Sequence, residues 1–352
     1  MLIKDILLRD PSKQALVNNG QARITNEAVD ENILKELHGE LSTFVCEGQY
    51  SDGIQKILSS YLKNLSQTGQ KAAWVSGFFG SGKSHLLKML CHLWKDTPFS
   101  DGATARSLAP DLPEDVRSLL RELDTAGKRS GGLFAAAGTL PAGTTDNVRL
   151  SVLSILLRAA GLPDQYPQAL FVLWLEESGH LAKVKGAVEA AGKTWASELN
   201  NLYVSPLIAK ALLAADPHFA TNEVEARKTL RAQFPVKSED LTSTEFIGTC
   251  KRVLKRAGRN GKMPCTILIL DEVQQYIGDS ETRSVLITDV AEAVSKEMDS
   301  QVILVGAGQS ALTGVKLLNK LMDRFTIRIQ LSDTDVETRR TTAMWRNCPV
   351  WP

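Results

Sequence analysis

The sequence predicts an α/β fold in which a parallel β-sheet lies between layers of helices. Short apolar runs typical of buried strands alternate along the chain with longer segments whose apolar residues recur at helical spacing. One apolar run leads into a glycine-rich turn at residues 77–84, and a helical pattern follows at once. A second run, at residues 265–270, is followed directly by two acidic residues. Strands and helices that alternate in this way predict a doubly wound, three-layer core.

The composition is that of a globular protein rather than a disordered one. Of the 352 residues, 43% are hydrophobic and 23% are charged. The 41 basic and 40 acidic residues give a net charge of +1, which provides no overall field for nucleic acid or a membrane. The five cysteines are scattered and form no C-x-x-C pair, which is typical of a reducing compartment. Without a signal-peptide pattern or an apolar stretch of about 18 residues, we expect a cytoplasmic protein with no membrane partner.

Residues 1–70 predict a helical lead-in, and residues 71–340 predict the core. Apolar residues recur at helical spacing in two stretches of the lead-in: Ile33, Leu34, Leu37 and Leu41, then Ile54, Ile57, Leu58, Leu62 and Leu65. In the core, a strand at 72–76 precedes a helix at 83–95. Another helix opens at Pro113, because proline followed by two acidic residues suits a first helical turn.

A large helical insertion is expected within the core. Further strands are predicted at 132–140, 265–270, 301–305 and 326–331, and further helices at 148–160, 281–298 and 311–322. Between them, residues 162–260 are almost entirely helical in pattern. Lys83 and Asp271 are 188 positions apart, whereas one β-α-β crossover needs roughly 30 residues. The excess predicts an insertion at about 162–260.

The glycine-rich turn GFFGSGKS matches the phosphate-loop pattern G-x-x-x-x-G-K-[ST]. Its glycines allow backbone angles closed to other residues, so that successive N–H groups point at an anion. Lys83 is expected to reach the β- and γ-phosphates, and the Ser84 hydroxyl to hold Mg²⁺. An ordinary glycine turn is the alternative, but a strand before and a helix after favour ATP with Mg²⁺. The predicted nucleotide contacts are Gly77, Phe78, Phe79, Gly80, Ser81, Gly82, Lys83, Ser84 and His85.

The stretch ILILDEVQQYI, residues 267–277, indicates which reaction the bound nucleotide undergoes. Asp271, at the carboxyl end of a strand, is placed to hold the metal, and Glu272 to act as general base on water. Alone, these two acids could simply begin a loop; together with the phosphate loop they favour hydrolysis over phosphoryl transfer. We expect the Lys83 loop and the two carboxylates to lie on neighbouring strand ends around one magnesium-bound triphosphate.

Two downstream positions are further candidates. Gln309 and Ser310 follow a predicted strand, where one could orient the attacking water or contact the γ-phosphate, although Ser310 could equally cap a helix. Arg324, just before the last strand, resembles the arginine that AAA+ ATPases present to a neighbouring subunit's nucleotide. A surface arginine that caps a helix is the alternative, and Arg328 is a second candidate for the same role.

Two other segments carry weaker signals. The basic run at 250–262 could contact a phosphate backbone, but a solvated face at a helix C-terminus is the simpler interpretation. The tail at 341–352 has no periodicity, and the helix expected from Ser332 or Asp333 stops early. We interpret the chain as a truncated or frame-shifted part of a longer protein.

Four segments together resemble the BrxC/PglY family, the P-loop ATPases of bacterial BREX (bacteriophage exclusion) systems. They are FVCEGQYSDGIQKILSSYLKNL, WVSGFFGSGKSHLLKML, ILILDEVQQYIG and LMDRFTIRIQLSDTDVETRR, and the similarity spans residues 1–340. The resemblance implies an AAA+-like P-loop NTPase core in a cytoplasmic ATPase that works beside an adenine methyltransferase and an alkaline-phosphatase-like protein. The family's nucleotide, metal and base positions match Gly77, Gly80, Gly82, Lys83, Ser84, Asp271 and Glu272. The chain is much shorter than those proteins.

The function expected from these features is an ATPase module that assembles or remodels a phage-defence complex, with an indirect link to DNA. A neighbour's arginine would complete the site, which implies a homo-oligomer. The alternative is a scaffold that responds to ATP with negligible turnover. A nucleoside or sugar kinase is disfavoured by Asp271 and Glu272.

Overall fold

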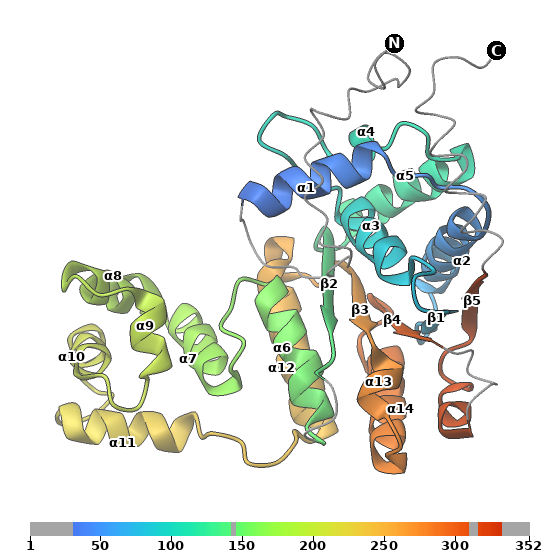
Figure 1. The fold of residues 1–352 in the computed structure, drawn as a ribbon. Helices are drawn as coiled ribbons and strands as arrows, with labels where there is room; N and C mark the ends of the chain where they lie inside the picture. The colour runs from blue at the N-terminus through green and yellow to red at the C-terminus, as the bar shows by residue number, and fades with distance from the viewer. Residues whose placement is uncertain (1–30, 142–145, 310–315, 333–352) are drawn as a thin grey trace, which may run out of the picture.

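The computed structural model describes residues 31–141, 146–309 and 316–332, and it contains a five-stranded, all-parallel sheet (Figure 1). The strand order is β2-β3-β4-β1-β5. The strands are β1 (Ala73–Gly77), β2 (Leu133–Thr139), β3 (Cys265–Asp271), β4 (Val302–Gly308) and β5 (Ile327–Leu331). All the predicted strands are present, and the α/β class with a parallel sheet is confirmed.

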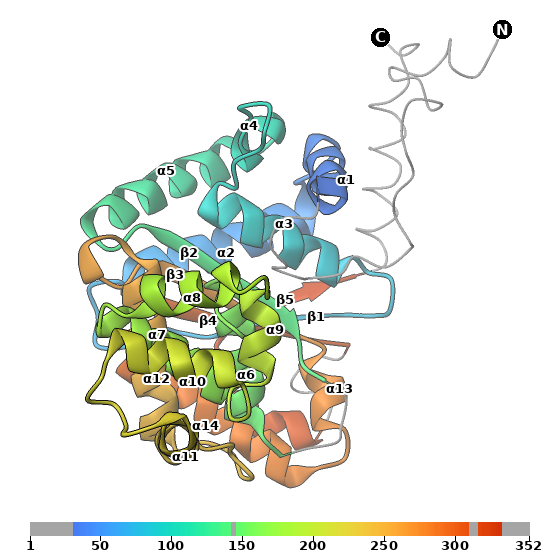
Figure 2. The ribbon, with the colours of Figure 1, turned by 90° about the vertical axis from the view of Figure 1, so that its left-hand side faces the viewer.

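Helices cover both faces of this sheet because its strands are apolar on both sides (Figure 2). On β1, for example, Ala73 and Val75 belong to one apolar cluster and Trp74 to the other. The first face is covered by α1 (Glu31–Ser42), α2 (Gly48–Asn64), α3 (Lys83–Lys95), α4 (Ala105–Leu108) and α5 (Glu114–Arg129). The second face is covered by α6 (Val148–Ala159), α12 (Ser243–Ala257), α13 (Val273–Ile277) and α14 (Glu281–Glu297).

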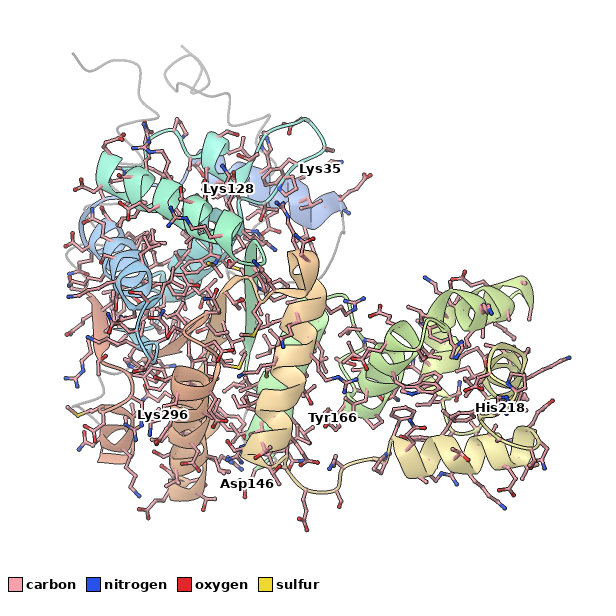
Figure 3. The ribbon with its side chains drawn as sticks, turned by 180° about the vertical axis from the view of Figure 1, so that it is seen from behind. Lys35, Lys128, Asp146, Tyr166, His218 and Lys296 are labelled. Carbon is pink, nitrogen blue, oxygen red and sulfur yellow. The ribbon has the colours of Figure 1, made fainter. Side chains whose placement is uncertain are left out.

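The remaining helices form an arm beside the sheet (Figure 3). They are α7 (Tyr166–Glu177), α8 (Leu181–Ala190), α9 (Trp195–Asn200), α10 (Pro206–Ala215) and α11 (Glu223–Gln233). Tyr166 lies where the arm meets α6 and α12, and His218 lies at its far end. The arm is tied to α12 by ion pairs of Arg252 with Glu177 and of Arg256 with Glu176. These two arginines of the basic run therefore join α12 to α7 instead of forming only a solvated face.

The strand order corrects one expectation. The phosphate-loop strand β1 and the acidic strand β3 are not neighbours, because β4 pairs with both of them. The two sites nevertheless meet, since α3 leaves β1, crosses over the sheet and contacts β3 and β2. The connections after β1 and β4 also run on opposite faces, which makes the β1–β4 boundary a topological switch point where ligands bind.

A second difference concerns the segment before β5. A regular helix was predicted at 311–322, but Lys316–Leu321 forms a 3₁₀ helix, η3. The predictions for residues 1–30, Ser310, 311–315 and everything after Ser332, including the 341–352 tail, fall outside the described residues. No helix in the part of the chain that the structure describes is long and apolar enough to cross a membrane.

Candidate functional site

The glycine-rich loop joins the carboxyl end of β1 to the amino terminus of α3. Gly80 (φ +86°) and Gly82 (φ +83°) both adopt the left-handed conformation that favours glycine. Gly82 is the N-cap of α3, and no side chain caps this terminus. The first N–H groups of α3 therefore have no intrahelical acceptor and no capping oxygen. Such a helix start attracts an anion.

The other fixed positions of the loop are set by close packing. A Cβ on Gly77 would lie 2.6 Å from Ser81 Oγ and 3.0 Å from the Leu331 carbonyl oxygen. A Cβ on Gly82 would lie 2.0 Å from the hydroxyl of Tyr50, which comes from α2. Neither position has room for a side chain, so the loop is held between β5 and the lead-in.

Lys83 folds back over the loop. Its Nζ donates hydrogen bonds to the carbonyl oxygens of Gly77 (2.6 Å) and Phe78 (3.0 Å). Burial lowers the pKa of this ammonium below its usual value, while the nearby carboxylates of Asp271 and Glu272 act in the opposite direction. The lysine charge thus shares one region with the two acids predicted to work with it.

The predicted metal ligands Ser84 and Asp271 are in direct contact. Asp271 is only 4% exposed, and its Oδ2 accepts a hydrogen bond of 2.6 Å from Ser84 Oγ. Its Oδ1 accepts a second bond, of 2.9 Å, from the backbone N–H of Glu272. A hydroxyl and a carboxylate oxygen are hard ligands of the kind Mg²⁺ prefers, and Mg²⁺ needs few protein ligands because it keeps several waters.

The site offers few protein ligands for a metal ion. Among the described residues, no group of three or more His, Cys, Asp or Glu side chains could hold a metal. A magnesium ion at Ser84 and Asp271 would depend on a bound phosphate for further ligands, which is the usual arrangement in nucleotide sites.

Glu272, the predicted base, has an unusual backbone. Its φ of +56° and ψ of +29° lie in the left-handed region, which is uncommon for a residue other than glycine. Burial raises the pKa of its carboxyl above the usual value, and the charge of Asp271 raises it further, while Lys83 lowers it. A carboxyl with a raised pKa that lies beside a lysine and a carboxylate is suited to accept a proton.

Four further residues were predicted to belong to the site: Phe78, Phe79, His85 and Gln309. Phe78 and Phe79 are 41% and 78% exposed, so their rings are not part of the apolar core. His85 lies against Phe44, with ring centroids 5.7 Å apart. Gln309 is exposed and follows β4, the strand between the loop strand and the acidic strand.

Arg324 does not join these residues. It precedes β5, at the amino ends of the parallel strands, whereas the loop follows the carboxyl end of β1. Its Nη2 and Nε bind Glu292 Oε2 at 2.6 and 3.1 Å. Within its own chain, the guanidinium is thus a partner of α14.

No protein-family model matches the chain, and no solved structure matches it.

The structure adds a residue that the sequence patterns did not single out. Tyr50 Oη donates a hydrogen bond of 2.7 Å to the carbonyl oxygen of Gly82. The ring of Tyr50 stacks on Phe44, at a centroid distance of 6.0 Å. Nothing in the sequence pattern relates a tyrosine in the lead-in to a loop 32 residues later.

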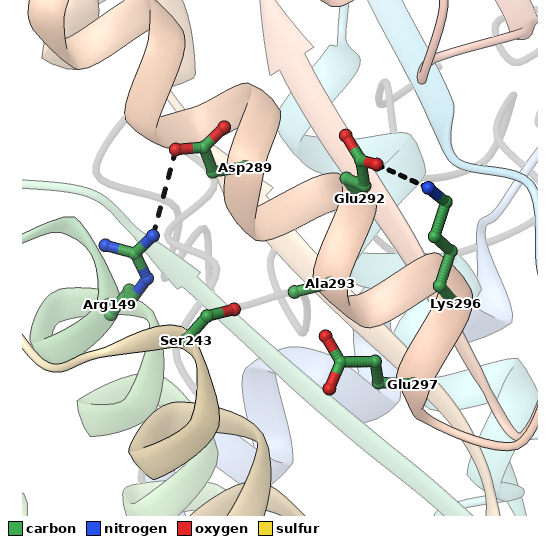
Figure 4. A pocket seen from close by; sticks show the side chains of 7 residues that line it. All are labelled: Arg149, Ser243, Asp289, Glu292, Ala293, Lys296 and Glu297. Carbon is green, nitrogen blue, oxygen red and sulfur yellow. Dashed lines mark hydrogen bonds and ion pairs between the residues drawn. The ribbon is translucent and has the colours of Figure 1, made fainter.

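A separate pocket of 400 Å³ lies among α14, α6 and the start of α12 (Figure 4). Its charged walls pair with one another: Arg149 with Asp289 at 3.8 Å, and Glu292 with Lys296 at 2.5 Å. The lining residues are Arg149, Ser243, Asp289, Glu292, Ala293, Lys296 and Glu297. None of them belongs to the loop or to the acidic pair, so this pocket is not part of the site.

Proposed function

We propose that the protein is a P-loop ATPase with an AAA+-like core, which binds Mg²⁺-ATP at residues 77–85 and hydrolyses it. The observation that carries this proposal is the 2.6 Å hydrogen bond between Ser84 and Asp271. These residues are 187 positions apart and follow strands that do not pair, yet they meet at the uncapped start of α3. A structural glycine turn has no need of a buried carboxylate at that point.

The roles of the residues follow from their chemistry. The loop amides and Lys83 would bind the β- and γ-phosphates, with Lys83 exchanging its bonds to loop carbonyls for phosphate oxygens. Ser84 and Asp271 would hold Mg²⁺, which neutralises phosphate charge when bound. Glu272 would take the proton of the attacking water, and Gln309 would orient that water.

The wider role is proposed from the family resemblance. A BrxC/PglY-like ATPase would act in the cytoplasm as part of a BREX phage-defence complex, beside an adenine methyltransferase and an alkaline-phosphatase-like protein. The nucleotide cycle would drive the assembly or remodelling of that complex, with DNA as an indirect partner. Arg324 of a neighbouring copy would complete the site in a homo-oligomer.

The contact between Arg324 and Glu292 favours a second candidate function. A guanidinium bound by its own chain is not free to reach a neighbour's nucleotide, which suits an ATP-responsive scaffold with negligible turnover. Mass measurements with and without ATP, combined with a turnover assay, separate the two. Oligomers that form with ATP but release no phosphate indicate the scaffold.

The test of hydrolysis is a phosphate-release assay on the Glu272→Gln variant. The variant keeps the size of the side chain and removes its basicity, so turnover should fall at least ~100-fold while ATP still binds. Glu225→Gln, with an exposed side chain on α11 in the arm, is a matched control that should leave turnover unchanged. Undiminished hydrolysis by Glu272→Gln would remove Glu272 from the proposed role.

A further inference from the structure

The first turn of α2 lies against the phosphate loop. Tyr50 is 5% exposed, and its hydroxyl donates to the Gly82 carbonyl oxygen at 2.7 Å. The same carbonyl accepts the N–H of Leu86 at 2.9 Å, the first hydrogen bond of α3. One carbonyl therefore joins the lead-in, the loop and the helix that follows it.

The Gly82 carbonyl controls a group that would face the ligand. It shares a planar trans peptide unit with the N–H of Lys83, and in such a unit the C=O and N–H point in opposite directions. That N–H is the first of α3 and has no intrahelical acceptor, so it is available to an anion. A donor that fixes the carbonyl therefore also aims this N–H, and polarisation of the unit strengthens it as a donor.

Tyr50 is itself firmly held. Its ring stacks on Phe44, and Phe44 also contacts His85 at the start of α3. The preceding residue, Gln49, binds the end of β5 through both atoms of its amide. Its Oε1 accepts the N–H of Ser332 at 2.7 Å, and its Nε2 donates to Ser332 Oγ at 2.8 Å.

We propose that Tyr50 is a positioning residue for the phosphates of a nucleoside di- or triphosphate. Its hydroxyl holds the Gly82–Lys83 peptide so that the Lys83 N–H points at the β-phosphate before the nucleotide arrives. This inference rests on the proposed nucleotide site. Because ADP and ATP both carry the phosphate that this N–H would bind, the hydroxyl strengthens the binding of both.

The test compares Tyr50→Phe with Tyr61→Phe. Tyr61 lies on the same helix and is buried, and its hydroxyl also donates to a backbone carbonyl, that of Gln301, at 3.0 Å. Gln301 precedes β4, so the Tyr61 hydroxyl binds at the amino ends of the strands, away from the loop at their carboxyl ends. The two variants remove the same group and the same kind of hydrogen bond from the same helix.

Three quantities are measured: ATP and ADP affinity by calorimetry, Tm without nucleotide, and amide hydrogen exchange of residues 78–84 without nucleotide. Tyr50→Phe should weaken both affinities about two- to tenfold, the range of one hydrogen bond, and should speed exchange in the loop. Tyr61→Phe should lower the Tm and leave affinity and loop exchange unchanged. If the role of Tyr50 were only structural, Tyr50→Phe would also lower the Tm and leave affinity and loop exchange unchanged.

The outcomes are separable from those of the proposed function. Equal losses of affinity in the two variants, or unchanged loop exchange in Tyr50→Phe, overturn the positioning role. If the wild-type protein binds neither ATP nor ADP, the proposed function fails, and the assignment of these phosphates to Tyr50 fails with it. In that case loop exchange still shows whether Tyr50 holds the Gly82 peptide.

Discussion

Replacing Gly82 by alanine tests how tightly the lead-in holds the phosphate loop. The new Cβ would lie 2.0 Å from Tyr50 Oη, far inside van der Waals contact. Gly82 also has a φ of +83°, which an alanine adopts only with strain. The substitution therefore carries two separate costs, one from the backbone and one from Tyr50.

The magnitude of each cost follows from the contacts. The left-handed conformation costs an alanine roughly 1–2 kcal/mol. Displacing the Tyr50 hydroxyl removes its 2.7 Å hydrogen bond, worth about 0.5–1.5 kcal/mol. Gly82→Ala should thus destabilise the wild type by about 1.5–3.5 kcal/mol. In a Tyr50→Phe background the nearest remaining atom is the ring Cζ at 3.3 Å, so mainly the backbone cost is left.

The assay is a double-mutant cycle by urea unfolding, in which the two substitutions should couple by roughly 1 kcal/mol. Gly80→Ala is the matched control, because Gly80 has a similar φ of +86° and nothing lies within 4 Å of the position that its new methyl group would take. It should show the backbone cost alone, in both backgrounds. An equal cost of Gly82→Ala with and without the Tyr50 hydroxyl would refute the reasoning.

Three further predictions concern charge. In Glu272→Gln, the Tm should rise at pH 8, and the gain should disappear in acid. The folded state raises the pKa of Glu272, so this carboxyl contributes stability at low pH that is lost as pH rises through the raised pKa. The glutamine carries no charge and therefore avoids that loss at pH 8. Lys83→Ala should weaken ATP binding at least ~10-fold in calorimetry, because the loop loses the charged group that would donate hydrogen bonds to the phosphates. Asp240→Ala should lower the urea midpoint by an amount equivalent to about 2 kcal/mol, since Asp240 caps α6 at the N–H groups of Arg149 and Leu150.

Each of these has an internal control. The Tm difference for Glu272→Gln must vary with pH; a constant gain would indicate relief of packing rather than of charge. Lys83→Ala should lower the Tm without nucleotide only modestly, since it removes two hydrogen bonds to loop carbonyls, and a large drop would mean that the loop has collapsed. Asp240→Asn retains an oxygen that can cap α6, so a loss as large as that of Asp240→Ala would contradict the capping explanation.

Most of the fold could be predicted because its signals are local. Each strand is a continuous apolar run, since the sheet is covered on both faces, and each covering helix repeats its apolar residues at helical spacing. The loop and the acids at 271–272 were visible for the same reason, because each motif is contiguous in the chain. Local patterns place elements and ends of elements well.

The arrangement of the strands was not accessible in this way. That β4 would lie between β1 and β3 depends on how the connections cross the sheet, and an apolar strand fits equally well beside several neighbours. The pairing of Tyr50 with Gly82 depends on the same long-range geometry. The 3₁₀ helix at Lys316–Leu321 was misjudged because a helical spacing of apolar residues does not distinguish the tighter helix from the α-helix over two turns.

The backbone of Glu272 gives an independent reason to look for function at this position. A left-handed conformation costs a residue with a Cβ roughly 1–2 kcal/mol, and glycine or asparagine would adopt it more easily. If the turn between β3 and α13 were only structural, either of those residues would serve better than a half-buried acid with a raised pKa. Strain and an unfavourable charge thus coincide at the residue that the sequence predicts as the base. Such costs are typical of positions where the side chain has a chemical role that no less strained residue can fill.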